Sequence, residues 1–227
     1  MKHQVTVALF LLFLLAPVYA LAAPTTAQTD AQTGPVAGEY CPEARVKAVI
    51  LEELSLSAAM AAKADKALSE DKLPDAALDL ANANAALQLA SSRGSAARTT
   101  KLIDAAVDSK ASENYKLMLG WFPLLQTAIG QLPDNAYTNA AAEAVSRSEA
   151  VLQGDRDGDA LSELRTARHW LTCDKLEIPV QEAKQGLGRI NQALYQREKP
   201  KPAIFEEVYK PLRQAIEYLY AQGNTRQ

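Results

Sequence analysis

The chain of 227 residues carries 24 Lys and Arg against 27 Asp and Glu, a formal net charge of −3, and it is 48% hydrophobic but only 6% aromatic. A mildly acidic chain without a basic cluster is a poor candidate for binding nucleic acid. Abundant alanine, sparse glycine and few aromatics favour closely packed helices over a sheet, so we expect an all-α protein.

The N-terminus is typical of a secretory signal peptide over residues 1–22. Lys2 gives a positive start, residues 5–18 are an apolar run, and Ala20-Leu21-Ala22 supplies small residues at a cleavage site. An uncleaved anchor is the alternative, but the run is shorter than the roughly 20 residues that span a bilayer. We therefore expect a periplasmic protein that is soluble after signal cleavage and has no stable membrane insertion.

The rest of the chain is expected to form one helical domain over residues 41–222. Residues 23–40 are rich in Thr, Ala, Gln and Pro without apolar periodicity, which predicts a flexible leader, and residues 223–227 are expected to be a disordered tail. Apolar residues at helical spacing predict helices over 42–69 and 75–92. Because the link between them is short and contains Pro74, these two helices are expected to form an antiparallel hairpin.

A weaker helix is expected over residues 96–107, and the run YKLMLGWFPLL from Tyr115 to Leu125 follows it. Gly120 and Pro123 interrupt this run, and its length and leucine content do not separate a buried extended crossover from a short helix. We expect an apolar crossover through the core, followed by a short helix that ends at Leu132.

A second hairpin is predicted from residues 137–153 and 159–175. Gly154 fits the left-handed position that ends a helix, and Asp159 fits the N-cap of the next helix. Its corner repeats the first one, since aligning Asp71 with Asp155 also aligns Leu80 with Leu164. Two copies are too few for a solenoid, so we expect both hairpins to pack in one bundle.

A C-terminal helical pair completes the predicted bundle. Pro179 is expected to start one helix and Ala203 the last, which runs to about Ala221 and which Pro211 should kink. The predicted fold is thus a helical bundle of two antiparallel hairpins plus a C-terminal pair, with an apolar crossover segment.

No metal site is expected. Asp155, Asp157 and Asp159 alternate as in an EF-hand loop, but Ala160 replaces the glycine of the sixth position and Thr166 the glutamate of the twelfth. This stretch is therefore expected to be a solvated turn.

No catalytic residues or cofactor are expected either. The predicted mature chain has one histidine, His169, on the solvent side of its helix, and Trp170 flanks the buried side. Cys-x-x-Cys, a nucleophile elbow and a glycine-rich phosphate loop are missing. The sequence therefore indicates that the protein is not an enzyme.

Cys41 and Cys173 are the two cysteines. In an oxidising compartment an even pair indicates first a disulfide. Two separate thiols, and an intermolecular bridge from Cys41 beside the leader, are the other interpretations, because the sequence does not place the two Cα atoms within reach of each other.

Two apolar segments are candidate ligand or partner surfaces, with core filling as the alternative for the first. The crossover contributes Tyr115, Met118, Trp121 and Phe122, and the last helix contributes Phe205, Tyr209, Tyr218 and Tyr220. The wide apolar coverage of the last helix indicates burial on two sides, so a homo-oligomer is expected.

From about Arg45 to Tyr220 the chain resembles the YfdX family of small exported bacterial helical proteins. The resemblance is carried by ALSEDKLPDAALDL, the crossover, VLQGDRDGDALSELRTA and the Pro179-Val180-x-x-Ala183 helix with INQAL. It implies a non-enzymatic helical bundle, often oligomeric, that is linked to envelope stress and binds small molecules or unfolded clients. The chain departs from the family at REKPKPAIFEEVYKPL, where the family tends toward a Gly-Tyr-Tyr-Glu-Ala-like turn.

The predicted function is that of a periplasmic, stress-associated binding or chaperone-like protein that takes up a protein client or a small apolar ligand through its apolar and aromatic surfaces. The alternative is a TPR-like structural adaptor that holds one specific envelope protein. An enzyme is the third hypothesis.

Overall fold

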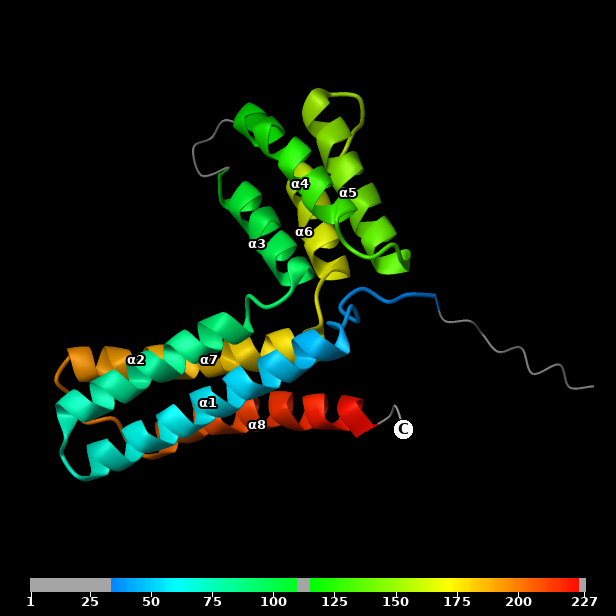
Figure 1. Cartoon of the computed structure of the whole chain (residues 1–227). Coiled ribbons are helices and arrows are strands. Elements are labelled where there is room, and N and C mark those ends of the chain that lie inside the picture. The colour runs from blue at the N-terminus through cyan, green and yellow to red at the C-terminus, as the bar shows by residue number, and fades with distance from the viewer. Residues whose placement is uncertain (1–33, 110–114, 225–227) are drawn as a thin grey trace, which may run out of the picture. The chain divides into compact units, whose positions relative to one another are not determined.

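Helices make up most of the described chain in the computed structural model (Figure 1). Residues 34–109 and 115–224 are described, so the predicted signal peptide, most of the predicted leader and residues 225–227 of the predicted tail lie outside them. In the described ranges the β-structure is an isolated bridge between Glu39 and Cys173. The prediction of an all-α helical bundle is confirmed.

The first bundle consists of α1 (Ala44–Ser69), α2 (Leu73–Ala90), α7 (Asp174–Tyr195) and α8 (Ala203–Asn224). Small residues let its helices approach closely: Ala61 and Ala83 are fully buried, and a Cβ on Gly186 would lie 2.8 Å from a methyl of Val208 on α8. The larger core side chains include Leu54, Leu80, Leu87, Leu187, Ile190, Phe205 and Leu212.

The second bundle consists of α3 (Ser95–Asp108), the 3₁₀ helix η2 (Tyr115–Trp121), α4 (Phe122–Gly130), α5 (Ala136–Gln153) and α6 (Ala160–Trp170). Its separate core includes Ile103, Met118, Phe122, Leu125, Val145 and Leu164. In sequence it is an insertion between α2 and α7 of the first bundle, so the chain passes from one bundle to the other twice, after α2 and after α6 (Figure 1).

The expectation that both predicted hairpins pack in one bundle is wrong. The α1–α2 hairpin packs against α7 and α8, whereas α5 and α6 pack with α3 and α4, and the described parts of the two hairpins make no contact with each other. The repeated corner is therefore a local motif that reverses the direction of the chain, and it occurs once in each bundle.

The run from Tyr115 to Leu125, for which an extended crossover and a short helix were both open, is helical. Pro123 occupies the first turn of α4, where a helix needs no amide donor, so it starts this helix instead of interrupting it.

The boundary between α6 and α7 differs from the prediction. α6 ends at Trp170 and α7 begins at Asp174, with Pro179 inside it. Cys173 has extended backbone angles as the N-cap, and its carbonyl accepts from the amides of Leu176 and Glu177. Acidic residues in the first turn also favour a helix start here, because they face the positive end of the helix dipole.

The end of the predicted leader is bound to the helices. Gly38 N donates to the carbonyl of His169 (3.0 Å), Tyr40 N donates to that of Thr172 (3.0 Å), and Asp174 N donates to that of Gly38 (2.8 Å). We call residues 36–43 the strap, because they lie across the link between α6 and α7.

The corner between α5 and α6 has the predicted caps. Gly154 is left-handed (φ 84°), and the Asp159 side chain accepts from the amide of Leu161 at 3.0 Å. No helix in the described ranges has the length and apolar content required to cross a membrane.

Leu164→Ala is expected to lower the free energy of unfolding by about 2–4 kcal/mol, because Leu164 is fully buried in the second core and truncation leaves a cavity. The matched change Asp155→Ala removes an exposed side chain and is expected to cost less than about 0.5 kcal/mol. Urea unfolding followed by circular dichroism measures both. Equal losses would contradict this description of the corner.

Candidate functional site

The predicted aromatic surface is not one site in the structure. Met118, Phe122 and Phe205 are buried core side chains, the first two in the second bundle and the third in the first. Trp121, Tyr209 and Tyr218 are partly buried against the same two cores, Tyr220 is 58% exposed, and the side chain of Tyr115 lies outside the described residues.

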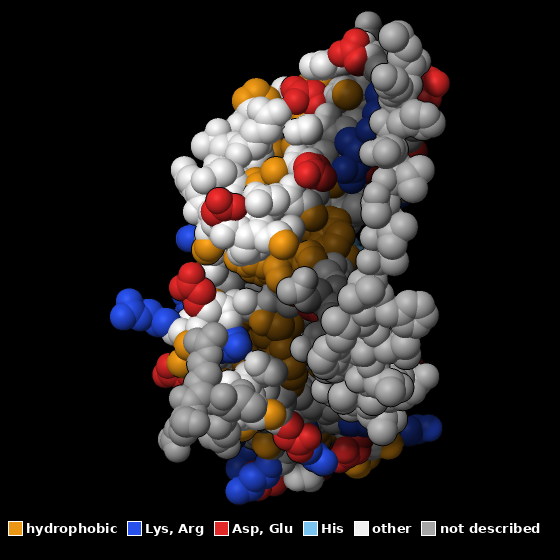
Figure 2. Space-filling view, turned by 90° about the vertical axis from the view of Figure 1, so that its right-hand side faces the viewer, with side chains coloured by type: hydrophobic (Ala, Val, Ile, Leu, Met, Phe, Trp, Pro, Cys, Tyr) orange, Lys and Arg blue, Asp and Glu red, His pale blue; other side chains and the backbone are white. Residues whose placement is uncertain are grey.

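Other apolar side chains also reach the surface. Figure 2 shows one face on which hydrophobic side chains gather in the middle, with charged side chains mostly toward its ends. The large exposed apolar residues are spread over several helices and include Leu56, Leu78, Leu89, Leu117, Leu124 and Ile178. Of the predicted surface residues, Tyr220 is exposed, whereas the burial of Met118 and Phe122 agrees with core filling, the alternative given for the crossover.

A cleft of about 210 Å³ lies where the two bundles meet. It is lined by the strap, the start of α1, the link from α2 to α3, the first turns of α3, and the segment from Arg168 to Lys184. Its apolar side consists of Val46, Ile50, Ala90, Leu171, Leu176 and Val180. The cleft is thus built by both crossings of the chain between the bundles.

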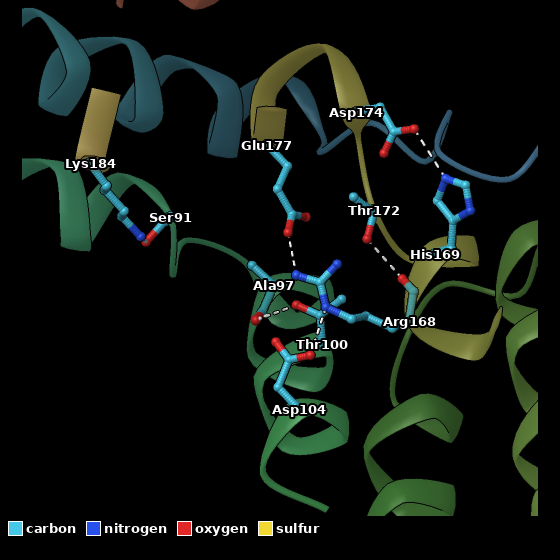
Figure 3. A network of polar contacts seen from close by, with 10 residues as sticks. All are labelled: Ser91, Ala97, Thr100, Asp104, Arg168, His169, Thr172, Asp174, Glu177 and Lys184. Atoms are coloured by element: carbon cyan, nitrogen blue, oxygen red, sulfur yellow. Dashed lines mark hydrogen bonds and ion pairs between the residues drawn. The ribbon is translucent and has the colours of Figure 1, made fainter. Parts of the chain in front are cut away.

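Arg168 bridges the bundles at this cleft (Figure 3). Its Nε donates to Oδ1 of Asp104 on α3 at 2.7 Å, and its terminal nitrogen pairs with Glu177 on α7. Burial raises the pKa of Asp104, and the charge and hydrogen bond of Arg168 partly oppose this rise. The guanidinium therefore stabilises two partly buried carboxylates that come from different bundles.

Lys184 brings a further positive charge to the cleft. Its Nζ donates to Oγ of Ser91 at 2.8 Å (Figure 3), and in the described ranges no carboxylate lies within ion-pair distance of it or of Lys101. Burial, and then the charge of Lys101, lower the pKa of Lys184, and the charge of Glu177 partly opposes this. An anion bound beside the amines of Lys101 and Lys184 would raise the pKa of Lys184 again.

The polar lining of this end of the cleft is richer in positive than in negative charge. Lys101, Arg168 and Lys184 face the carboxylates of Asp104 and Glu177. Helix α3 also begins here, and its N-cap Gly94 (φ 89°) offers no side chain to accept from the first amides.

The remaining charged groups of the lining lie elsewhere. Arg93 is paired with Glu53, and Glu43 lies close enough to Tyr40 to help raise the pKa of the tyrosine, after burial. The carboxylates of Glu53 and Glu43 therefore form no ion pair with Lys101 or Lys184.

The structure brings the two cysteines together. Sγ of Cys41 and Sγ of Cys173 are 2.8 Å apart as free thiols, and the hydroxyl of Tyr218 lies 2.8 Å from the first and 3.7 Å from the second. Tyr218 was predicted only as a candidate surface residue, and its contact with the thiols was not expected from the sequence.

The described residues contain no group of three or more His, Cys, Asp and Glu side chains placed to hold a metal. Asp155, Asp157 and Asp159 are exposed, as expected of a solvated turn. His169 is exposed as predicted, and its Nε2 lies 3.0 Å from Oδ2 of Asp174.

Comparison with known proteins finds no matching family model, curated protein or solved structure. The resemblance to the YfdX family stays a prediction.

Arg168→Met is expected to lower the free energy of unfolding at pH 7 by about 1–3 kcal/mol, because it removes charged hydrogen bonds and leaves Asp104 and Glu177 unbalanced. The control Arg165→Met changes an exposed arginine of the same helix and is expected to cost less than about 0.5 kcal/mol.

The loss caused by Arg168→Met should depend on pH. Without Arg168 the pKa of Asp104 rises further above its unfolded value, so the folded variant takes up a proton before the unfolded chain does. The deficit relative to the wild type should therefore shrink as the pH falls from 7 toward 4. A deficit that stays constant in urea unfolding across this range would contradict the electrostatic role of Arg168.

Proposed function

We propose that the protein is a non-enzymatic binding protein of the periplasm, and that it holds a small amphiphilic anion in the cleft between its two bundles. The observation that carries the proposal is Lys184, a half-buried amine without a carboxylate partner in the described chain, next to an apolar wall. Its place in envelope stress follows from the family resemblance alone.

The apolar wall supports a ligand with a hydrophobic body. Val46 and Ile50 of α1 line the cleft together with Leu176 and Val180 of α7, and burial of apolar surface is the main source of affinity in such clefts. A protein client with a large exposed face would not fit a cleft of this size.

The charged end supports a negatively charged head group. Neither Lys101 nor Lys184 forms an ion pair with a carboxylate in the described chain, since Asp104 and Glu177 are both bound to Arg168, although the charge of Glu177 still acts on Lys184. A carboxylate, sulfonate or phosphate would accept hydrogen bonds from the amines, which are stronger than neutral ones.

The chaperone-like hypothesis has less support than the small-ligand hypothesis. Phe122 and Phe205, two of the aromatic side chains that were expected to take up a client, are core residues, so a client would have to open a bundle to reach them. The TPR-like adaptor has less support still, because the described parts of the two hairpins lie in different bundles and do not stack as successive repeats would.

A pair of fluorescent dyes tests this proposal. 8-Anilinonaphthalene-1-sulfonate is anionic, whereas N-phenyl-1-naphthylamine has the same aromatic frame without the sulfonate. Lys184→Met is expected to weaken binding of the anionic dye roughly tenfold or more, because a charged hydrogen bond is lost, and to change binding of the neutral dye less than about twofold.

Lys175→Met is the matched control, because Lys175 is an exposed lysine of the same helix that does not line the cleft. It should leave the affinity for both dyes unchanged. If neither dye binds the wild type, or if Lys184→Met and Lys175→Met bind the anionic dye equally well, the proposal is wrong.

A further inference from the structure

Cys41, Cys173 and Tyr218 meet at the edge of the cleft although they are far apart in the sequence. Cys41 belongs to the strap, Cys173 is the N-cap of α7 and Tyr218 lies near the end of α8. Cys173 lines the cleft itself, as do Tyr40, Pro42 and Glu43 of the strap. A bond between the two sulfurs would therefore join one wall of the cleft to another.

Apart from the contacts of Cys41 and the edge-to-face contact of the Tyr40 ring with that of Tyr137 (5.9 Å between centroids), the strap is held by few interactions. Three backbone hydrogen bonds connect Gly38 and Tyr40 to the link between α6 and α7. Gly38 has φ 86°, and a Cβ there would lie 2.7 Å from Nε2 of His169, so the strap approaches the link as closely as glycine allows. Without a covalent bond, such a short segment opens at a lower free energy than the helices do.

We propose that Cys41 and Cys173 form a reversible intramolecular disulfide that fastens the strap as a wall of the cleft and thereby slows ligand exchange. The effect on ligand exchange rests on the proposed function, whereas formation of the disulfide and immobilisation of the strap do not.

A small-molecule disulfide such as oxidised glutathione supplies the oxidising equivalents. The Cys41 thiolate attacks one sulfur of the glutathione disulfide, which breaks that S–S bond and releases one glutathione thiolate. Cys173 then attacks the Cys41 sulfur and displaces the second glutathione. The protein loses two electrons and two thiol protons, and one disulfide becomes two glutathione thiols.

The structure indicates which cysteine attacks first. Cys41 is half-buried and accessible, whereas Cys173 is 7% exposed. The hydrogen bond from Cys173 lowers the pKa of Cys41 to about 6, with Tyr218 contributing and burial opposing. The pKa of Cys173 is raised by its contact with Cys41 and by burial. Cys41 is thus the first nucleophile, and Cys173 resolves the mixed disulfide from 2.8 Å away.

Serine variants test the order of attack. The reduced protein is mixed with oxidised glutathione, quenched with acid and analysed by mass spectrometry. The wild type should reach the intramolecular disulfide, Cys173→Ser should stop at one glutathione adduct on Cys41, and Cys41→Ser should react at least about tenfold more slowly than Cys173→Ser. Equal rates for the two variants, or wild-type protein that accumulates only mixed disulfides or dimers, would overturn the proposal.

Tyr218→Phe tests the contact between the hydroxyl and the thiol. In the wild type the rate of reaction with glutathione disulfide should rise with pH through a midpoint near 6. Loss of the tyrosine hydrogen bond should move this midpoint upward, whereas Tyr220→Phe, a change at an exposed tyrosine of the same helix, should not move it. Equal midpoints in the two variants would contradict the proposed role of Tyr218.

Hydrogen exchange tests the strap without any ligand. Oxidation should slow exchange of the amides of Gly38, Tyr40 and Asp174 at least about tenfold and leave that of Leu161, in the second bundle, unchanged. It should also raise the midpoint of thermal unfolding by roughly 10 °C, because the bond closes a long loop. Unchanged exchange of the strap amides after oxidation would contradict the proposal that the disulfide fastens the strap.

Stopped-flow release of 8-anilinonaphthalene-1-sulfonate tests the effect on the cleft. The oxidised protein should release the dye at least about fivefold more slowly than the reduced protein, since the strap must open for exchange. Equal release rates would overturn control of ligand exchange. If the dye binds neither form, the proposed function fails, and hydrogen exchange alone decides whether the disulfide fastens the strap.

Discussion

The guanidinium of Arg168 holds together two helices that belong to different bundles, and the cleft depends on this interaction. Asp104 of α3 and Glu177 of α7 each bind it, so the guanidinium connects α3 with α7 although the two bundles have separate cores. The chain crosses between the bundles after α2 and after α6, and the ion pair of Arg168 with Glu177 reinforces the second crossing. Because burying charged side chains in an apolar core costs free energy, the two cores do not join here, and the junction between the bundles remains a cleft.

Features with a local cause were predictable from the sequence. The C-cap at Gly154 and the N-cap at Asp159 depend on backbone angles and on a side chain near its own helix, so the corner was predicted correctly. The assignment of hairpins to bundles was not predictable. Alanine-rich helices bury broad faces and fit several partners, so periodicity shows that a hairpin must pack but does not choose the helices that cover it.

The cleft was missed because its polar residues have no local signature. Lys184 directly follows Ala183 of the inward row of α7, and Arg168 directly follows the buried Ala167 of α6. A charged residue at the edge of a buried row is a weak signal, since most such residues reach solvent along their aliphatic stems. The aromatic residues gave a stronger signal, but Phe122 and Phe205 fill cores, as large apolar side chains do more often than they line sites.

The contacts of the first turn of α7 explain why this helix begins earlier than Pro179. They also explain which segments form the walls of the cleft. Cys173 contacts Cys41, Asp174 contacts His169, and Glu177 binds Arg168. Had the helix begun at Pro179, this single turn would not exist, and the strap, the end of α6 and the second bundle would lose their common support. Pro179 removes one amide donor from α7, a cost that these contacts offset. The same turn therefore positions the charged wall of the cleft and the thiol that can fasten the opposite wall.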